Sequence, residues 1–398
     1  MENPKIRFKG FTKDWEQRKL GDVFEQTSNL VNPKEDEIEL WSLTVEDGLT
    51  KKSDRYNREF LVKKDDNFKE VRPGDIVYNP MNMTLGAVGY NGMAKSVAVS
   101  GYYTTMVAKE NYDTYYINTW LKSPQAIRLY RTYATGSLIE KQRVQFPTLS
   151  IIPVTFPKYE EQIKIGSYFH SIDNLITLHQ RKCEQTKKMK KYMLQKMFPQ
   201  NGAKVPEIRF DGFTYDWEQR KFSELYARSS EKNDGSIGMD KNITVATMQF
   251  KNDVKVSTTE YLKTYYTFKL GDIAFEGHQS KEFRYGRFVE NDIGNGIVSH
   301  IFAVFRPIQE YDLYFWKYAI NNETLMQRIL ARSTKASTMM HDLVTNDFLN
   351  ETFLVPSVKE QKQIGAFLNK LDNLITLHQR KCDELKKMKK YMLQNMFI

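Results

Sequence analysis

Apolar residues recur at alternating steps of four and three along residues 160–198. This heptad spacing predicts one long helix with a narrow apolar seam, and a seam that narrow needs a second seam to cover it. Pro199 marks the end of the helix, because proline cannot continue the helical hydrogen-bond pattern. The seam consists of Ile165, Phe169, Ile172, Ile176, His179, Cys183, Thr186, Lys190, Met193 and Met197.

Nearly the same segment returns in the second half of the chain. Asp173–Phe198 and Asp372–Phe397 differ at only four of their 26 positions, at an offset of 199 residues. Two matching seams in one chain bury each other best by the self-complementary pairing of a twofold dimer. We therefore predict two long helices packed as an antiparallel coiled coil. The second seam consists of Ile364, Leu368, Leu371, Ile375, His378, Cys382, Leu385, Lys389, Met392 and Met396.

A second repeated block opens each half. Pro4–Leu20 and Pro206–Phe222 share the string IRF-x-GFT-x-DWEQRK. Because tryptophan has a large apolar body, Trp15 and Trp217 are expected to anchor these blocks in their domain cores.

The halves diverge between these blocks and the helices. Residues 21–156 and 223–355 both have short β-branched or aromatic runs, separated by glycine and proline turns and followed by a helix. The fold class is therefore α+β, with two pseudo-twofold-related globular domains at 1–156 and 200–355, separated by helices at 157–199 and 356–398. The expected strands and helix are 38–45, 75–78, 96–100, 104–108 and 114–132, then 243–248, 272–275, 286–289, 297–305 and 313–330.

Composition narrows the class of protein. A chain of 398 residues can hold at least two cores, and it contains no apolar run long enough to cross a membrane and no signal peptide. Two cysteines at repeated helical positions fit a reducing compartment, so we expect a cytoplasmic protein. The net charge of +10 is concentrated at 179–198 and 378–398, which leaves the globular parts neutral. These lysines and arginines form either solvated helix faces or contacts to phosphates or a partner protein.

The motifs of the obvious enzymes are missing. A DNA amino-methyltransferase needs an Asn/Asp/Ser-Pro-Pro-aromatic loop, and the nearest string, Asn79-Pro80-Met81-Asn82, lacks the second proline and the aromatic residue. The sequence has neither a G-x-x-x-x-G-K-[ST] loop nor a G-x-G-x-x-G turn after a strand. We therefore expect no cofactor site in this chain. His179 and Cys183 with His378 and Cys382 could supply a zinc ligand set, although small buried seam residues are the more common role for such positions.

Side chains suited to nucleic acid gather in the turn-rich parts of both variable segments. Gln, Arg, Lys and Asn read base edges, while Ser, Thr and Tyr suit phosphates; the alternative is an ordinary exposed loop. The candidates are Asn79, Thr84, Tyr90, Tyr102, Tyr103, Thr104, Ser137, Lys141, Gln142 and Arg143 in the first half, and His278, Gln279, Ser280, Lys281, Arg284, Tyr285, Arg287, Lys335, Ser337 and Thr338 in the second.

The order of variable segment, helix, variable segment and helix resembles the specificity (S) subunit of type I restriction-modification systems. The resemblance covers essentially the whole chain and rests on strings such as Phe156-Pro157 … Glu161-Gln162 and Val355-Pro356 … Glu360-Gln361. The repeated DWEQRK blocks resemble those of staphylococcal-type members. The sequence departs from the pattern at 333–337, where Ser-Thr-Lys-Ala-Ser replaces the Gly-Ser of the first half.

The resemblance implies a non-catalytic subunit. Each variable segment would be a target-recognition domain for one half of a split site in double-stranded DNA. The helices would set the spacer between the half-sites and bind two methyltransferase (M) subunits, with restriction (R) subunits joining through the complex. S-adenosylmethionine, ATP and Mg would be used by those partners and not by this chain. The rival interpretations are a solitary DNA methyltransferase or nuclease with tandem recognition domains, and a structural coiled-coil adaptor.

Overall fold

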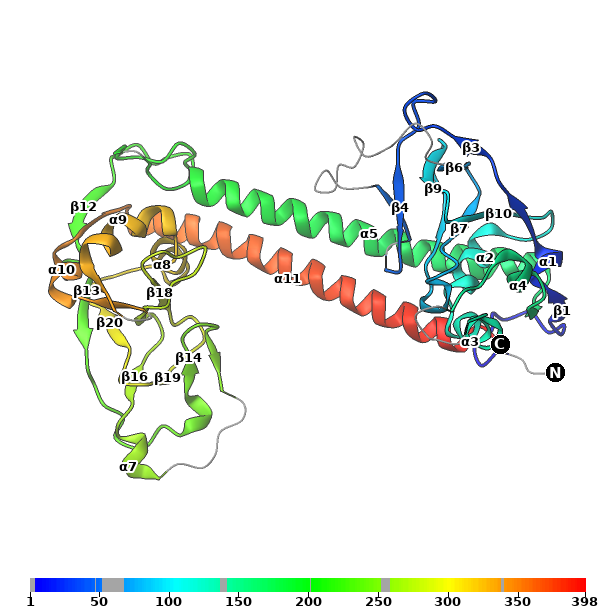
Figure 1. Ribbon diagram of the computed structural model, residues 1–398. Helices are drawn as coiled ribbons and strands as arrows, with labels where there is room; N and C mark the ends of the chain where they lie inside the picture. The colour runs from blue at the N-terminus through cyan, green and yellow to red at the C-terminus, as the bar shows by residue number, and fades with distance from the viewer. Residues whose placement is uncertain are drawn as a thin grey trace. The chain divides into compact units, whose positions relative to one another are not determined.

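The computed structural model describes residues 4–46, 48–51, 68–136, 142–200, 202–251, 258–337 and 340–398. The chain divides into two compact units (Figure 1). Unit 1 consists of Met1–Gln180 and Arg380–Ile398, and unit 2 consists of Arg181–Gln379. Unit 1 therefore contains both ends of the chain.

Unit 1 is built on antiparallel sheets of short strands. The four-stranded sheet has the order β2 (Phe24–Thr27), β10 (Thr104–Ala108), β7 (Ile76–Tyr78) and β8 (Val88–Tyr90). Its core-facing residues are apolar, since Ile76, Tyr78 and Met106 are fully buried. The smaller sheets are β3 (Leu30–Val31) with β6 (Phe68–Val71) and β9 (Val97–Ser100), β4 (Trp41–Thr44) with β5 (Gly48–Lys51), and β1 (Glu16–Lys19) with β11 (Pro153–Phe156).

Short helices complete unit 1. The prediction of a single helix over 114–132 is wrong, because the structure has two helices there, α2 (Thr114–Leu121) and α3 (Pro124–Tyr133). Ser123 separates them: its hydroxyl accepts a hydrogen bond from the amide of Ala126 at 3.1 Å, and Pro124 occupies the first helical position, where no amide is needed. The remaining helices are α1 (Leu20–Val23), the 3-10 turn η3 (Met83–Leu85) and α4 (Phe146–Ser150).

Unit 2 repeats this order with its own residues. Its four-stranded sheet runs β13 (Tyr226–Ser229), β20 (Ala303–Pro307), β17 (Ile273–Glu276) and β18 (Arg287–Glu290). The other strand pairs are β12 (Glu218–Lys221) with β23 (Thr352–Val355), β14 (Ile243–Thr244) with β15 (Gln249–Phe250), β16 (Tyr266–Phe268) with β19 (Gly296–Val298), and β21 (Thr334–Ala336) with β22 (His341–Leu343). The helices are α6 (Phe222–Leu225), η5 (Met239–Lys241), α7 (Thr259–Leu262), α8 (Leu313–Ile320), α9 (Glu323–Ser333) and α10 (Thr345–Asn350).

Turns divide three segments of unit 2 that were expected to be continuous. The strand expected over 297–305 is two strands, because the amide of Phe302 closes a turn on the carbonyl of Ser299 at 3.1 Å. The strand expected over 243–248 stops at Thr244, and Met248 has a positive φ of 48° that strand geometry excludes. The helix expected over 313–330 is divided by Asn322, whose side chain caps α9.

The two long helices are α5 (Tyr159–Lys196) and α11 (Val358–Asn395). In unit 1 the first part of α5 runs antiparallel to the last part of α11: Ile176 packs with Cys382, and Lys389 Nζ lies 2.6 Å from Asp173. In unit 2 the remaining parts pair in the same way, with Lys190 Nζ 2.6 Å from Asp372. The predicted antiparallel helix pair is confirmed, and both cysteines lie in its buried seam.

Each long helix ends inside a globular core. Met396 and Phe397, which directly follow α11, lie in the main core of unit 1, where the Phe397 ring stacks on Phe169 at 5.8 Å between centroids. Gln125 donates from Nε2 to the Phe397 carbonyl at 2.9 Å. Phe198, which follows α5, is buried in the same manner in the core of unit 2. Each core therefore includes the end of the helix that starts in the other half of the sequence.

The opening blocks are fixed to the starts of the long helices by buried ion pairs. Arg7 donates two hydrogen bonds to Glu161, at 2.7 and 2.8 Å, and Arg209 donates two to Glu360 at the same distances. Glu161 and Glu360 are 2% and 1% exposed. Trp15 and Trp217 are buried as predicted.

Candidate nucleic-acid interface

The candidate residues of unit 1 gather at one end of its four-stranded sheet. Thr104 at the start of β10 pairs with Tyr78 at the end of β7. The loop that begins at Asn79 and the turn that carries Tyr102 and Tyr103 therefore leave the sheet from the same end. Lys69 holds this turn by donating from Nζ to the Tyr103 carbonyl at 2.7 Å, and burial lowers the pKa of Lys69.

An antiparallel bridge between Thr135 and Arg143 brings the candidates Gln142 and Arg143 to the same place. Thr135 and Arg143 exchange backbone hydrogen bonds at 3.0 and 2.9 Å, and the next amide, of Val144, donates to the Pro80 carbonyl at 3.0 Å. Gln142 and Arg143 are thereby attached to the loop of Asn79. The candidates Ser137 and Lys141 lie outside the described residues.

The unit 1 candidates differ in their exposure. Tyr102 is 89% exposed and Arg143 is exposed, so both can reach a ligand. Thr84 and Thr104 are buried. The Asn79 side chain accepts a hydrogen bond from the Met81 amide at 3.0 Å, which stabilises the loop itself. Half-buried side chains complete the set: Tyr90, whose ring packs edge-on against Tyr115 and whose pKa is raised by burial, Tyr103 and Gln142.

In unit 2 the candidates converge around His341. The loop after β17 and the β21–β22 hairpin are joined where the His341 amide donates to the Gly277 carbonyl at 2.9 Å. Gln279 donates from its side-chain amide to His341 Nε2 at 2.6 Å, and the Tyr285 ring lies edge-on to the imidazole at 5.4 Å. His278 forms a bridge to Met340. The hairpin therefore presents Lys335 beside this loop.

Most unit 2 candidates are solvent-exposed. Arg284 lies over the ring of Tyr285 at 5.5 Å. Arg287 differs from the exposed candidates, because it is half-buried and bonded within the unit. It donates to Glu276 at 2.8 Å and to the Ala246 carbonyl at 2.8 Å. Thr338 lies outside the described residues. The exposed side chains are His278, Gln279, Ser280, Lys281, Arg284, Lys335 and Ser337.

Two residues at these sheet ends escaped the sequence-based prediction. His341 organises the unit 2 loops, but a single histidine between Met340 and Asp342 gives no signal in the sequence. Ile301 is 74% exposed in the turn before β20. It stands 199 residues after Tyr102, so aligning the two halves would have identified it. Both units therefore present a large exposed side chain on the same turn.

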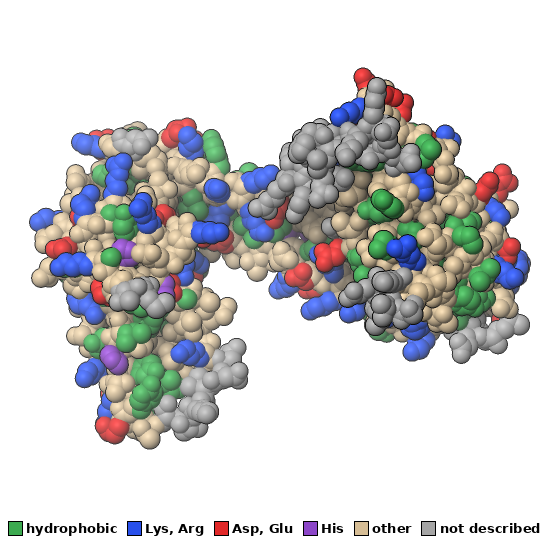
Figure 2. Space-filling view, in the orientation of Figure 1, with side chains coloured by type: hydrophobic (Ala, Val, Ile, Leu, Met, Phe, Trp, Pro, Cys, Tyr) green, Lys and Arg blue, Asp and Glu red, His purple; other side chains and the backbone are tan. Residues whose placement is uncertain are grey.

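The exposed side chains at both sheet ends are of the types that bind nucleic acid. Lys and Arg lie scattered among acidic and apolar side chains over the visible face of each unit, without a single basic patch (Figure 2). The exposed donors and cations can contact base edges and phosphates. Among the described residues, no group of three His, Cys, Asp or Glu side chains is placed to hold a metal ion. No helix in the described part of the chain has the length and apolarity to cross a bilayer.

Comparisons with known proteins agree on one family. The family model described as "Type I restriction modification DNA specificity domain" matches twice, at residues 12–188 and 215–387. The type I restriction enzyme MjaVIII specificity subunit of Methanocaldococcus jannaschii is 23% identical over 364 residues, covering 86% of this chain and 83% of that protein. The crystal structure of a type I restriction-modification S subunit from M. genitalium has the same fold. It superposes with a TM-score of 0.63 at 15% identity and covers 100% of this chain and 99% of its own.

Proposed function

Since the chain belongs to the family of type I restriction-modification specificity subunits, which are non-catalytic, we propose that each of its units reads one half of a bipartite, asymmetric DNA site. One observation carries the proposal. The two units share their strand order, while the side chains at the equivalent sheet ends differ between them. A shared frame with different surfaces fits the recognition of two different short sequences.

The exposed chemistry supports direct readout of DNA. Arg143 in unit 1 and Arg284 in unit 2 are cationic side chains able to form bidentate contacts with guanine or to bind phosphate. Gln279 and His278 add side chains that can donate and accept hydrogen bonds. Tyr102 and Ile301 offer large exposed surfaces that suit sugars and base edges.

The long helices supply a second part of the proposal. Outside their seam they expose apolar residues at repeated positions: Leu178 and Tyr192 are 43% and 48% exposed, and Leu377 and Tyr391 are 39% and 58% exposed. Exposed apolar side chains on a helix suit a partner helix. We propose that two methyltransferase subunits dock here, that restriction subunits join through them, and that the helices set the number of unspecified base pairs between the half-sites.

The remaining chemistry belongs to the partners in this proposal. The methyltransferase and restriction subunits would use S-adenosylmethionine, ATP and Mg. The assembly would act on double-stranded DNA in the cytoplasm. Methyl transfer to DNA by the purified chain alone, with S-adenosylmethionine added, would contradict this division of labour and favour a solitary methyltransferase.

A domain exchange tests the half-site assignment. Residues 21–156 are replaced by the corresponding segment of another specificity subunit, and the chimaera is expressed with the methyltransferase subunit. Mapping of methylated adenines should show one half-site changed and the other retained. The reciprocal exchange of 223–355 is the matched control and should change the other half-site. A change in both half-sites, or in neither, after either exchange would contradict the proposal.

A further inference from the structure

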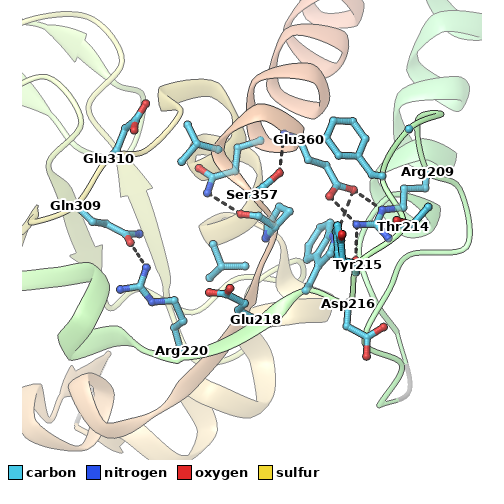
Figure 3. A pocket seen from close by; sticks show the side chains of 17 residues that line it. Arg209, Thr214, Tyr215, Asp216, Glu218, Arg220, Gln309, Glu310, Ser357 and Glu360 are labelled. Atoms are coloured by element: carbon cyan, nitrogen blue, oxygen red, sulfur yellow. Dashed lines mark hydrogen bonds and ion pairs between the residues drawn. The ribbon is translucent and has the colours of Figure 1, made fainter.

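Each unit has a surface groove where its opening block meets the start of a long helix. The groove of unit 1 has a volume of about 440 Å³ and is lined by Glu16, Arg18, Tyr112, Pro157 and Tyr159 among others. The groove of unit 2 has a volume of about 360 Å³, and Figure 3 shows its lining, including Glu218, Arg220 and Gln309. The two grooves are equivalent, because each is bounded by the same three parts of its unit. These are the EQRK strand (β1 or β12), the residues that follow β10 or β20, and the proline before the long helix, Pro157 or Pro356.

One pair of charged residues faces both grooves. Successive side chains of a strand point to opposite sides, so Glu16 and Arg18 lie on one face of β1. These two line the groove of unit 1, and Glu218 and Arg220 line that of unit 2. Each groove therefore presents one carboxylate and one guanidinium from identical strands.

The internal contacts of this pair differ between the two units. In unit 1, Arg18 forms an ion pair with Glu16, and both side chains are 45% exposed. In unit 2, Arg220 instead donates to Glu224 at 3.2 Å and to Gln309. Exposed ion pairs contribute little to stability, because water screens the charges. The two units thus have the same pair of residues, but the pair makes different contacts within each unit, and these contacts contribute little to stability.

Other residues of the grooves have diverged. Glu110 of unit 1 corresponds to Gln309 of unit 2, Lys158 to Ser357, and Tyr159 to Val358. Divergence is greater still at the sheet ends assigned to DNA. The opposite face of the strand is repeated as well, as Gln17 and Lys19 in unit 1 and Gln219 and Lys221 in unit 2. The repeat gives both grooves the same carboxylate and guanidinium, so a ligand whose charges fit one groove fits the other.

The grooves lie at the other end of the sheet from the candidate DNA interface. The groove residues Glu110 and Tyr112 follow the end of β10, whereas Tyr102 precedes its start. Five residues of antiparallel strand span about 17 Å. In unit 2, Gln309 likewise follows the end of β20 and Ile301 precedes its start. A ligand in the groove would leave the DNA end of the same unit free, which favours a protein over DNA.

We propose that the two grooves are docking sites for two copies of one protein, the methyltransferase (M) subunit, here called the modification subunit. This inference rests on the proposed function. The docked segment presents a carboxylate to Arg18 or Arg220 and a cation to Glu16 or Glu218. It packs an apolar side chain against Pro157 or Pro356. This polar site is separate from the exposed apolar positions of the long helices and fixes the partner next to each sheet.

Charge reversal in one groove at a time tests the inference through stoichiometry. The full chain with Glu16→Lys and Arg18→Glu is co-expressed with the modification subunit, and the complex is weighed by native mass spectrometry. We expect one modification subunit per chain instead of two. The equivalent change in unit 2, Glu218→Lys with Arg220→Glu, should also leave one, and the two changes together should leave none.

Matched controls separate docking from folding. Gln17→Arg with Lys19→Glu alters the opposite face of the same strand and should retain two modification subunits. If a reversed chain has a lowered Tm, the neutral variant Glu16→Gln with Arg18→Gln replaces it and should still weaken recruitment to unit 1. Reversed chains that fold and recruit two modification subunits, as wild type does, would overturn the docking inference alone. A wild-type chain that recruits none would overturn the proposed function and the docking inference with it.

Discussion

Truncating the side chain of Phe397, the penultimate residue, should destabilise the unit that contains the first third of the chain. Phe397 is 4% exposed in the core of unit 1, where it stacks on Phe169 and lies 5.7 Å from the ring of Tyr116. Phe→Ala changes in cores cost about 3–5 kcal/mol, because apolar contacts are lost and a cavity remains. At tenfold per 1.4 kcal/mol, the open state of unit 1 should become roughly 150 to 4,000 times more populated.

Hydrogen exchange followed by mass spectrometry measures this effect unit by unit. In Phe397→Ala, peptides from β7 and β10 should lose protection by that factor, while peptides from β17 and β20 keep theirs. Phe198→Ala is the matched change in the other copy and should produce the reverse pattern. Tyr391→Ala, at a position that is 58% exposed on α11, the helix before Phe397, should change stability by no more than about 0.5 kcal/mol.

Two results would refute the reasoning. Unchanged protection of β7 and β10 in Phe397→Ala would mean that the end of α11 does not belong to the core of unit 1. Equal losses in both units would mean that the chain opens as one cooperative body, so that the two cores are not energetically separate.

Two further predictions concern buried charge. Burial raises the pKa of Glu290 above its ordinary value of 4.5, so the contribution of this side chain to the stability of unit 2 should be greatest below that value and fall as the pH rises towards the folded-state pKa. Glu290→Gln should remove this loss of stability with rising pH in urea titrations at several pH values, and an unchanged pH dependence would contradict the assignment. Arg209→Ala should lower the free energy of unfolding by about 3–5 kcal/mol, because it leaves the carboxylate of Glu360 buried without its cation. Lys389→Met, which breaks a half-exposed pair with Asp173, should cost no more than about 1 kcal/mol; equal losses in thermal unfolding of the two variants would contradict the role of burial.

The sequence predicted the helix pair well, because the heptad spacing of apolar residues is enough to define two helices that bury their seams against each other. The heptad positions of both seams include Phe169, Cys183 and Cys382, and all three are buried. The repeat also identified the two halves, and the family is confirmed by the model matches over 12–188 and 215–387. A long periodic pattern averages over many residues, so local exceptions do not change its reading.

The sequence was a poorer guide to short elements and to the candidate site. Single capping residues such as Ser123 and Asn322 divided helices whose apolar pattern continues across them. The role of His341 depends on contacts with residues about 60 positions earlier in the chain, namely Gln279 and Tyr285. Burial of Thr84 and Thr104 likewise follows from tertiary packing, which a list of polar residues in turns does not contain.

The placement of the helix ends has a consequence for synthesis. A ribosome makes residues 1–180 of unit 1 before unit 2, yet Met396 and Phe397, which fill part of the unit 1 core, are made about 200 residues later. At about 5–20 residues per second, the first domain waits roughly 10–40 s for the residues that complete it. During that interval Trp15, Phe169 and their neighbours surround an unfilled apolar hollow that a chaperone can cover. The N-terminal domain is therefore completed only after the residues of unit 2 have been made, and a premature stop codon before residue 396 removes part of the N-terminal core.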